Sequence, residues 1–237
     1  MFDGQAALRA LIDHPLFCFA LTLAAYQLAL ALYERTRWVV MQPVLLAMLM
    51  VIPVLLLCDI DFARYRDGTQ LLSLFLGPAT VALAVPLYLN LRRIRQLFWP
   101  VVLTLVIGGL FATLAGVGLA WWFGADDMVL MTLLPKSVTS PIAMLVAEQI
   151  GGVAALAAVF VLITGVLGAI FGPPLLSWIG VRHPAARGMA LGITAHAVGT
   201  AQALQESEET GAFSALAMSV LGAATAILLP LAVLFLR

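Results

Sequence analysis

Residues 101–123 read VVLTLVIGGLFATLAGVGLAWWF, which is 23 consecutive residues without a charged side chain. A helix needs about 20 apolar residues to cross the hydrocarbon core of a bilayer. The run therefore predicts a transmembrane α-helix. Trp121 and Trp122 lie at its end, where aromatic side chains anchor a helix at the membrane–water interface. The rest of the chain has the same character, so this stretch decides the fold class.

The composition of the whole chain is that of a membrane protein. Of its 237 residues, 63% are apolar, and only 12 basic and 12 acidic residues are present, so the formal net charge is zero. A soluble domain has about 45–50% apolar and about 25% charged residues, and its surface needs polar cover. These values exclude disorder, a disulfide scaffold and a soluble enzyme. Without a basic cluster, nucleic-acid binding is not expected.

Eight apolar segments follow one another along the chain: 16–33, 38–58, 71–90, 101–123, 128–149, 153–171, 185–204 and 212–236. They predict an all-α, polytopic membrane protein with about seven to eight membrane segments, in which residues 1–237 form a single integral membrane domain. Arginine-rich loops stay in the cytoplasm. If all eight segments crossed the membrane, the loop that contains Arg182 and Arg187 would lie outside, against this rule. Segment 128–149 has a polar middle, so we expect it to be re-entrant rather than spanning.

Two stretches 115 residues apart suggest an internal repeat. LGPATVALAVPLY at 76–88 aligns with LGITAHAVGTAQA at 191–203. A basic loop follows the first stretch and an acidic loop the second, which is the charge pattern of an inverted-topology repeat. We expect one repeat at 15–123 and the other at 128–236. The alternative is that glycine- and alanine-rich helices align by chance.

Discontinuous helices are expected within both stretches, because proline interrupts helical hydrogen bonding and glycine weakens a helix. The residues expected to break the two helices are Gly77, Pro78, Pro86, Gly192 and Gly199. The alternative reading of the prolines is a kink that improves packing.

A proline-bracketed polar run interrupts the fifth segment, LLPKSVTSPIAMLVAEQIGG at 133–152. Between Pro135 and Pro141 lie Lys136, Ser137, Thr139 and Ser140. Irregular backbone at membrane depth must face protein or a water-filled cavity. A half-helix that begins there would direct free N–H groups at an anion. The run therefore predicts an anion-binding break.

Lys136 is the only lysine of the chain. A lysine within the membrane is costly, so a functional role is the first hypothesis; the alternative is that it extends to the interface or pairs with an acid. Glu148 lies 12 residues further on, which is about 18 Å along a continuous helix. It is expected either to face water or to take part in ion or proton coupling.

A second small-residue stretch, RGMALGITAHAVGTAQALQ at 187–205, contains a histidine. Helical spacing places His196, Gly199, Thr200 and Ala203 on one stripe. His196 and Thr200 are candidate substrate contacts, and His196 is also a candidate proton carrier. The alternative is a structural hydrogen bond of a buried histidine.

The segments LGPATVALAVPLY, LLPKSVTSPIAM with the following EQIGG, and RGMALGITAHAVGTAQALQ together resemble the LrgB/CidB family of membrane proteins, including its YohK branch. The resemblance covers residues 65–236. It implies one of two functions. Some members are described as holin-like or antiholin-like proteins that modulate murein hydrolase activity and autolysis, beside a smaller LrgA/CidA-like partner. Others resemble carriers of pyruvate, or of glycolate and glycerate in the related plastid translocator.

The residues and the resemblance agree best on a secondary transporter of small monocarboxylates such as pyruvate, glycolate or lactate, with protons as the coupling ion. The alternative is the holin/antiholin-like regulator. No enzymatic activity, cofactor or metal is expected, since no corresponding motif is present. We expect a multi-pass protein of the bacterial inner membrane. Its expected partners are the lipid bilayer, the carboxylate and an LrgA/CidA-like protein, and a homodimer suits such a carrier.

Overall fold

The computed structural model describes residues 9–36, 41–75, 78 and 81–236. These residues form helices joined by turns, and no strand occurs among them. The chain is therefore an all-α, polytopic membrane protein, as the apolar segments predict. Its packing separates two compact units, Met1–Ala82 and Leu83–Arg237.

Four of the described helices are long and apolar enough to cross a membrane. They are α2 (Phe17–Thr36), α9 (Phe98–Trp122), α12 (Ala154–Trp178) and α14 (Glu208–Leu236). α3 (Pro43–Leu57) is apolar but shorter. The predicted segment 71–90 contains the short helices α5 (Gln70–Leu74) and α7 (Ala84–Leu89). Gly77, expected to break this segment, lies outside the described residues, and Pro78 is exposed.

The first unit is built on a pair of packed helices. α2 and α3 bury Ala25, Ala29, Ala47 and Val51 in one cluster. Small side chains let two helices approach closely in a membrane. α4 (Phe62–Gly68) lies across α2, where the Tyr65 hydroxyl is 2.9 Å from Thr22 Oγ1. None of the predicted substrate contacts belongs to this unit.

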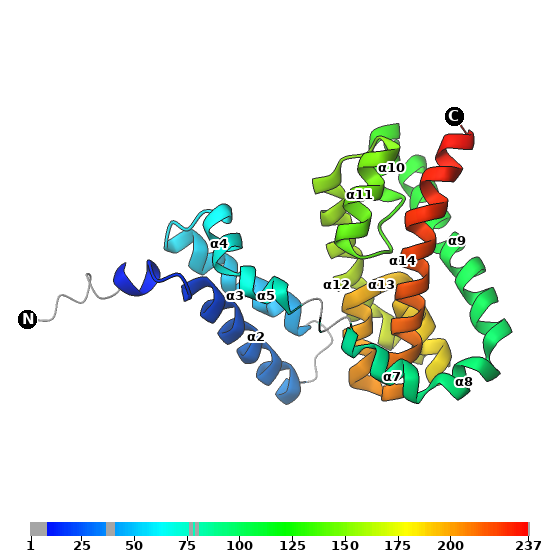
Figure 1. Ribbon diagram of the computed structural model, residues 1–237, viewed down its shortest axis with the longest axis horizontal. Helices are drawn as coiled ribbons and strands as arrows, with labels where there is room; N and C mark the ends of the chain where they lie inside the picture. The colour runs from blue at the N-terminus through cyan, green and yellow to red at the C-terminus, as the bar shows by residue number, and fades with distance from the viewer. Residues whose placement is uncertain (1–8, 37–40, 76–77, 79–80, 237) are drawn as a thin grey trace, which may run out of the picture. The chain divides into compact units, whose positions relative to one another are not determined.

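The second unit holds two hairpins among α9, α12 and α14 (Figure 1). Hairpin 1 is residues 127–153, with α10 (Asp127–Leu133), a turn at 134–139 and α11 (Ser140–Ile150). The Asp126 carboxylate caps α10 by accepting from Val129 N at 2.8 Å. At the other end, Val153 N donates to Thr132 Oγ1 at 2.9 Å. The end of the segment thus folds back against α10, as a re-entrant segment does.

Hairpin 2 is α13 (Pro184–Glu206), a helix broken at His196, where φ is 41° and ψ is −125°. The two arms on either side of the break fold back on each other, because Arg187 Nε lies 2.7 Å from Glu206 Oε2. A straight helix would hold these two residues about 28 Å apart. The predicted discontinuity is therefore present in this segment, and it falls at the histidine.

Gly192 and Gly199 lie on either side of that break, within the helical arms. A Cβ at Gly192 would collide with the Ser214 carbonyl of α14, and a Cβ at Gly199 would collide with the Leu191 carbonyl of the opposite arm. Their function in the fold is therefore close packing. They allow hairpin 2 to close on itself and α14 to lie directly against it.

The two halves of this unit share one plan. α9 and α12 are each 25 residues long and end at a tryptophan, Trp122 or Trp178. Two residues later comes a glycine with positive φ, 83° at Gly124 and 79° at Gly180. A hairpin then follows each helix, and α12 connects the base of hairpin 1 to the base of hairpin 2, so the hairpins enter from opposite ends. This relation joins 98–150 with 154–206; the longer repeats at 15–123 and 128–236 stay a prediction.

Candidate functional site

The tips of the two hairpins lie on the same stretches of α9 and α12. On α9, Lys136 of hairpin 1 binds the carbonyl of Ala112, while the Ala112 side chain packs against the cluster that contains Ile193 of hairpin 2. On α12, Val138 of hairpin 1 shares a buried cluster with Val161, whose carbonyl is 3.0 Å from Nε2 of His196. Ala112 and Val161 therefore mark the place where both tips converge.

Lys136 lies at the tip of hairpin 1, with its ammonium turned toward α9. Nζ donates to the Ala112 carbonyl at 3.0 Å and to Ser137 Oγ at 3.2 Å. The side chain lies over Gly116, where any Cβ would collide with its Cε carbon. The missing side chain of Gly116 therefore makes the space that the lysine occupies.

No carboxylate neutralises this ammonium within the part of the chain that the structure describes. Its two partners are a neutral carbonyl and a neutral hydroxyl. Lys136 is half-buried, and a charge withdrawn from water is normally paired, so its ammonium lacks a counter-charge among the described residues. This geometry disfavours the alternative in which Lys136 forms a structural ion pair.

The neighbours of Lys136 complete the tip of hairpin 1. Ser137 is buried, and its oxygen accepts from the lysine, which leaves its hydroxyl hydrogen to donate. Thr139 is the residue before α11, but its side chain makes no capping hydrogen bond. Ser140 and Pro141 form the first turn of α11, and Pro135 is fully buried. The free N–H groups in the first turn of α11 thus receive no capping bond from the Thr139 side chain.

His196 occupies the tip of hairpin 2 and is 3% exposed. Because a carbonyl only accepts, the bond to Val161 requires a hydrogen on Nε2, so Nδ1 of the neutral ring is an acceptor. Nδ1 has no hydrogen-bond partner among the described residues. The backbone at His196 has the φ and ψ of a type II′ turn, which glycine favours. A strained residue with an unused buried acceptor is typical of a functional position.

Thr200 lies one turn beyond the break and is buried. Its hydroxyl donates to the His196 carbonyl at 2.8 Å and is 2.9 Å from Ser214 Oγ of α14. These bonds satisfy a carbonyl at the break and tie it to α14. The geometry places Thr200 beside His196, as the predicted stripe requires, but its oxygen is already engaged.

Glu148 does not join the two tips. It is exposed near the end of α11, about 13 Å along the helix from Thr139. Pro86 is also apart from them: it lies in α7, where its carbonyl accepts from the side chain of Asn90 at 3.0 Å. Of the candidate polar residues, the structure therefore brings together the tip of hairpin 1, His196 and Thr200.

The base of hairpin 2 is closed by an ion pair that the sequence patterns did not indicate. Besides Nε, Arg187 Nη2 lies 2.8 Å from Glu206 Oε1, so the contact is bidentate. Arg187 Nη1 also donates to the Val181 carbonyl at 3.0 Å and to Ser177 Oγ at 3.2 Å. The two side chains of the pair are 13% and 21% exposed. Arg187 thus joins both arms of the hairpin to the end of α12.

The sequence patterns also missed the residues of the long helices that the two hairpin tips contact. Ala112, Val161 and Ser214 are ordinary residues in apolar helices, and no local motif marks them. One signal was available: Gly108, Ala112 and Gly116 recur every four residues on α9, which we interpret from sequence as a helix-packing face. Ile193 of hairpin 2 lies 3.3 Å from the Cβ position of Gly108, so the stripe receives both hairpins.

The chain is similar to known proteins over most of its length. The LrgB-like family matches residues 22–235 of the chain. The Bacillus subtilis (strain 168) protein YxaC is 35% identical over 200 residues, which cover 84% of this chain and 87% of that protein. Antiholin-like protein LrgB from Bacillus cereus (strain B4264) is 30% identical over 218 residues, covering 92% and 95%. No solved structure matches the chain.

Proposed function

The chain belongs to the LrgB-like family, and from this premise we propose that it is a secondary transporter of small monocarboxylates such as pyruvate, glycolate or lactate. The proposal assigns the carboxylate to the place where the hairpin tips converge. No chemical transformation of the substrate is involved. The protein would act in the bacterial inner membrane, in keeping with the bacterial relatives named above.

The observation that carries the proposal is the uncompensated ammonium of Lys136. Its bonds to Ala112 O and Ser137 Oγ hold it in place without neutralising it. A small carboxylate would supply the missing negative charge and accept from Ser137, Thr139 or Ser140. Charge-assisted hydrogen bonds of this kind are the strong ones. The ammonium and the hydroxyl groups of this tip, rather than the name of any relative, favour a small monocarboxylate.

His196 is assigned the coupling role in preference to Glu148. Its Nδ1 is a buried acceptor without a partner, so it can take a proton when substrate enters. Glu148 is exposed and away from both tips. Re-entrant hairpins that enter from opposite ends suit alternating access, since each tip can be uncovered toward a different side.

Two further assignments are part of the proposal. An LrgA/CidA-like small membrane protein would act beside this chain, and the chain would itself form a homodimer. Both are tested by purifying the protein alone and with that partner, and by measuring the mass of each assembly.

The central experiment is uptake of radiolabelled pyruvate, glycolate and lactate into proteoliposomes, with and without a proton gradient. Wild-type protein is expected to show saturable uptake that the gradient stimulates. Lys136→Ala should lower uptake at least a hundredfold, since losing a hydrogen-bonded charge costs about 3 kcal/mol of binding. The matched control is Arg66→Ala, an exposed cation in the first unit.

Two results would contradict the assignment. Normal uptake by folded Lys136→Ala protein would remove the lysine from the site. No saturable uptake by wild-type protein, with or without the LrgA/CidA-like partner, would remove the transport function itself.

A second candidate function rests on the name of the relatives. The Bacillus cereus protein is called antiholin-like, so we also consider that this chain modulates murein hydrolase activity and autolysis by assembling in the membrane. The discriminating measurement is leakage of an encapsulated dye. Assembly predicts leakage that rises with protein density and does not saturate with substrate, whereas a carrier leaves the dye inside.

A further inference from the structure

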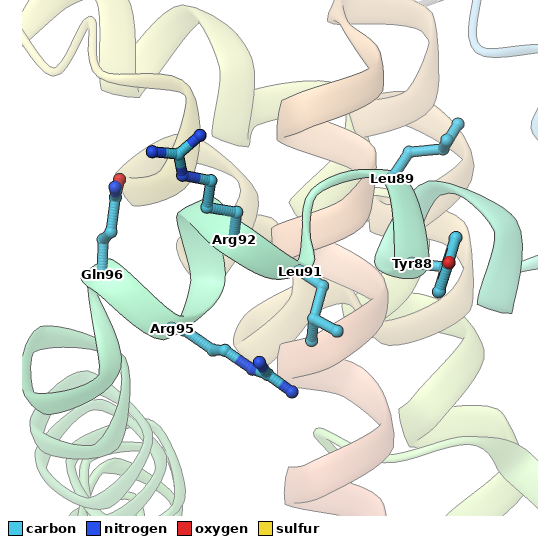
Figure 2. Close-up of a pocket in the computed structure, with 6 residues that line it drawn as sticks. All are labelled: Tyr88, Leu89, Leu91, Arg92, Arg95 and Gln96. Atoms are coloured by element: carbon cyan, nitrogen blue, oxygen red, sulfur yellow. The ribbon is translucent and has the colours of Figure 1, made fainter.

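A bend between two short helices forms a hollow that the transport site does not use. α7 ends and α8 (Leu91–Gln96) begins at Asn90, whose side chain binds back to the Pro86 carbonyl. Beside this bend lies an open hollow of about 610 Å³. Figure 2 shows the residues that line it: Tyr88, Leu89, Leu91, Arg92, Arg95 and Gln96. The hollow combines an apolar part with two cations and an amide.

The three arginines of α8 are not equivalent. Arg93 is engaged: its Nε is 3.4 Å from Glu209 Oε1 of α14, and its Nη2 is 3.3 Å from His183 Nε2. Within the described residues, Arg92 and Arg95 form no ion pair. Both line the hollow, and Figure 2 shows Arg92 and Gln96 leaving one side of α8 while Leu91 and Arg95 leave the other. Two guanidinium groups are thus free to bind an external anion.

The depth of the hollow in the membrane is set by the residues that follow. Phe98 and Trp99 begin α9, are 56% and 70% exposed, and contact each other edge to face. Exposed aromatic side chains at the end of a crossing helix mark the membrane–water interface. α8 therefore lies at the level of the lipid headgroups. Its three arginines place it on the cytoplasmic side, by the rule that positive loops stay inside.

We propose that this hollow binds an anionic phospholipid of the cytoplasmic leaflet. The guanidinium group of Arg95, which leaves α8 on the same side as Leu91 (Figure 2), would bind the phosphate in bidentate fashion. Arg92, on the other side of α8 in Figure 2, would attract the anionic headgroup by its charge. The acyl chain would leave along Tyr88, Leu89 and Leu91. Basic pockets beside membrane helices bind anionic headgroups in this way. A phospholipid satisfies both the charged and the apolar lining, whereas a small free anion satisfies only the charged part.

A lipid in this hollow would also affect how the second unit is held in the bilayer. α7 packs against α14, and Arg93 ties α8 to Glu209 at the start of α14. A lipid held by Arg92 and Arg95 would therefore fix this end of the unit to the bilayer. The proposal does not depend on what the protein transports.

Native mass spectrometry of the full chain tests the proposal. Protein released from nanodiscs that contain equal amounts of phosphatidylglycerol and phosphatidylcholine is expected to retain phosphatidylglycerol selectively. The variant R92Q/R95Q should retain about thirtyfold less, since each arginine near an anionic surface contributes about 1 kcal/mol. R93Q is the matched control: it removes the same charge from the same helix and should keep the lipid.

The opposing outcomes are equally definite. Equal retention of the two lipids, or unchanged retention by folded R92Q/R95Q, would overturn the proposal. Glycerol 3-phosphate serves as the competing free anion. If it displaces phosphatidylglycerol at comparable concentration, the hollow binds free phosphate esters and the lipid assignment is wrong.

Discussion

Hairpins 1 and 2 resemble each other in outline and differ in where they carry charge. Hairpin 1 has its cation at the tip, where Lys136 reaches α9 and meets no acid among the described residues. Hairpin 2 has a strained histidine at its tip, while its charged residues Arg187 and Glu206 pair at the base. A charge at the tip offers a binding site, whereas a pair at the base holds the arms together. Under the proposed transport function, this difference would give the binding of the anion to hairpin 1 and a closing role to hairpin 2.

The substitution with the largest expected effect fills the space beside α9 that the Lys136 side chain of hairpin 1 occupies. Gly116→Leu would displace the Lys136 side chain from the Ala112 carbonyl, because even a Cβ collides there. Uptake at low substrate is expected to fall about a hundredfold, as for loss of a charged hydrogen-bonded contact. Thermal melting should change little, because a flexible lysine can swing away.

Gly118→Leu is the control for that experiment. It lies on the same helix, and nothing is within 4 Å of its Cβ position. If Gly116→Leu and Gly118→Leu transport equally well, the placement of Lys136 against α9 is unimportant for function.

The next test separates the effect of backbone strain at His196 from the effect of its imidazole side chain. His196→Gly suits the backbone, since φ is 41° there, but removes the imidazole. Uptake should fall about tenfold, and the melting temperature should stay the same or rise because strain of about 1–3 kcal/mol is relieved. Asp59→Gly, the other described non-glycine residue with positive φ, should affect stability alone. A variant His196→Gly with full, gradient-stimulated uptake would make the histidine structural only.

Breaking the base of hairpin 2 should produce a smaller, mainly structural effect. Glu206→Gln leaves Arg187 largely buried without its partner, at a cost of about 2 kcal/mol once partial exposure is allowed for. The melting temperature should drop by about 4–8 °C. Glu208→Gln, at an exposed acid that begins α14, is the control. Equal melting of the two variants would show that the ion pair does not hold the arms.

The smallest effect is expected at Glu148. Because this carboxylate is exposed away from both tips, Glu148→Gln should change uptake less than about twofold, which is within the usual effect of a surface substitution. Its uptake should respond to a proton gradient as the wild type does. A loss of gradient stimulation would return the coupling role to Glu148.

Local patterns predicted the fold class and the break in hairpin 1. A transmembrane helix is encoded by a run of apolar residues, and the interruption of hairpin 1 is encoded by prolines and hydroxyls within a few positions. Lys136 could be singled out because one charge in such a setting is costly. These are short-range effects, so the sequence contains them in adjacent residues.

Long-range features were beyond such patterns. The break in hairpin 2 falls at His196, although the turn geometry there favours glycine and two glycines lie nearby; packing against α12 and α14 outweighs the local preference. Arg187 and Glu206 lie far apart on any continuous helix, so their pairing follows only once the hairpin has formed. The role of Gly116 depends on a lysine 20 positions further on.

The hydrogen bond between His196 and Val161 lies next to the backbone amide of Gly165, so that amide is sensitive to whether hairpin 2 is in place. In a helix the Val161 carbonyl also accepts from the N–H of Gly165, and a Cβ at Gly165 would meet the imidazole ring itself. Exchange of that amide hydrogen for deuterium requires water to reach a position inside a membrane helix. The exchange rate of the Gly165 amide should therefore rise when hairpin 2 opens, and it can be measured in the wild-type protein without a substrate.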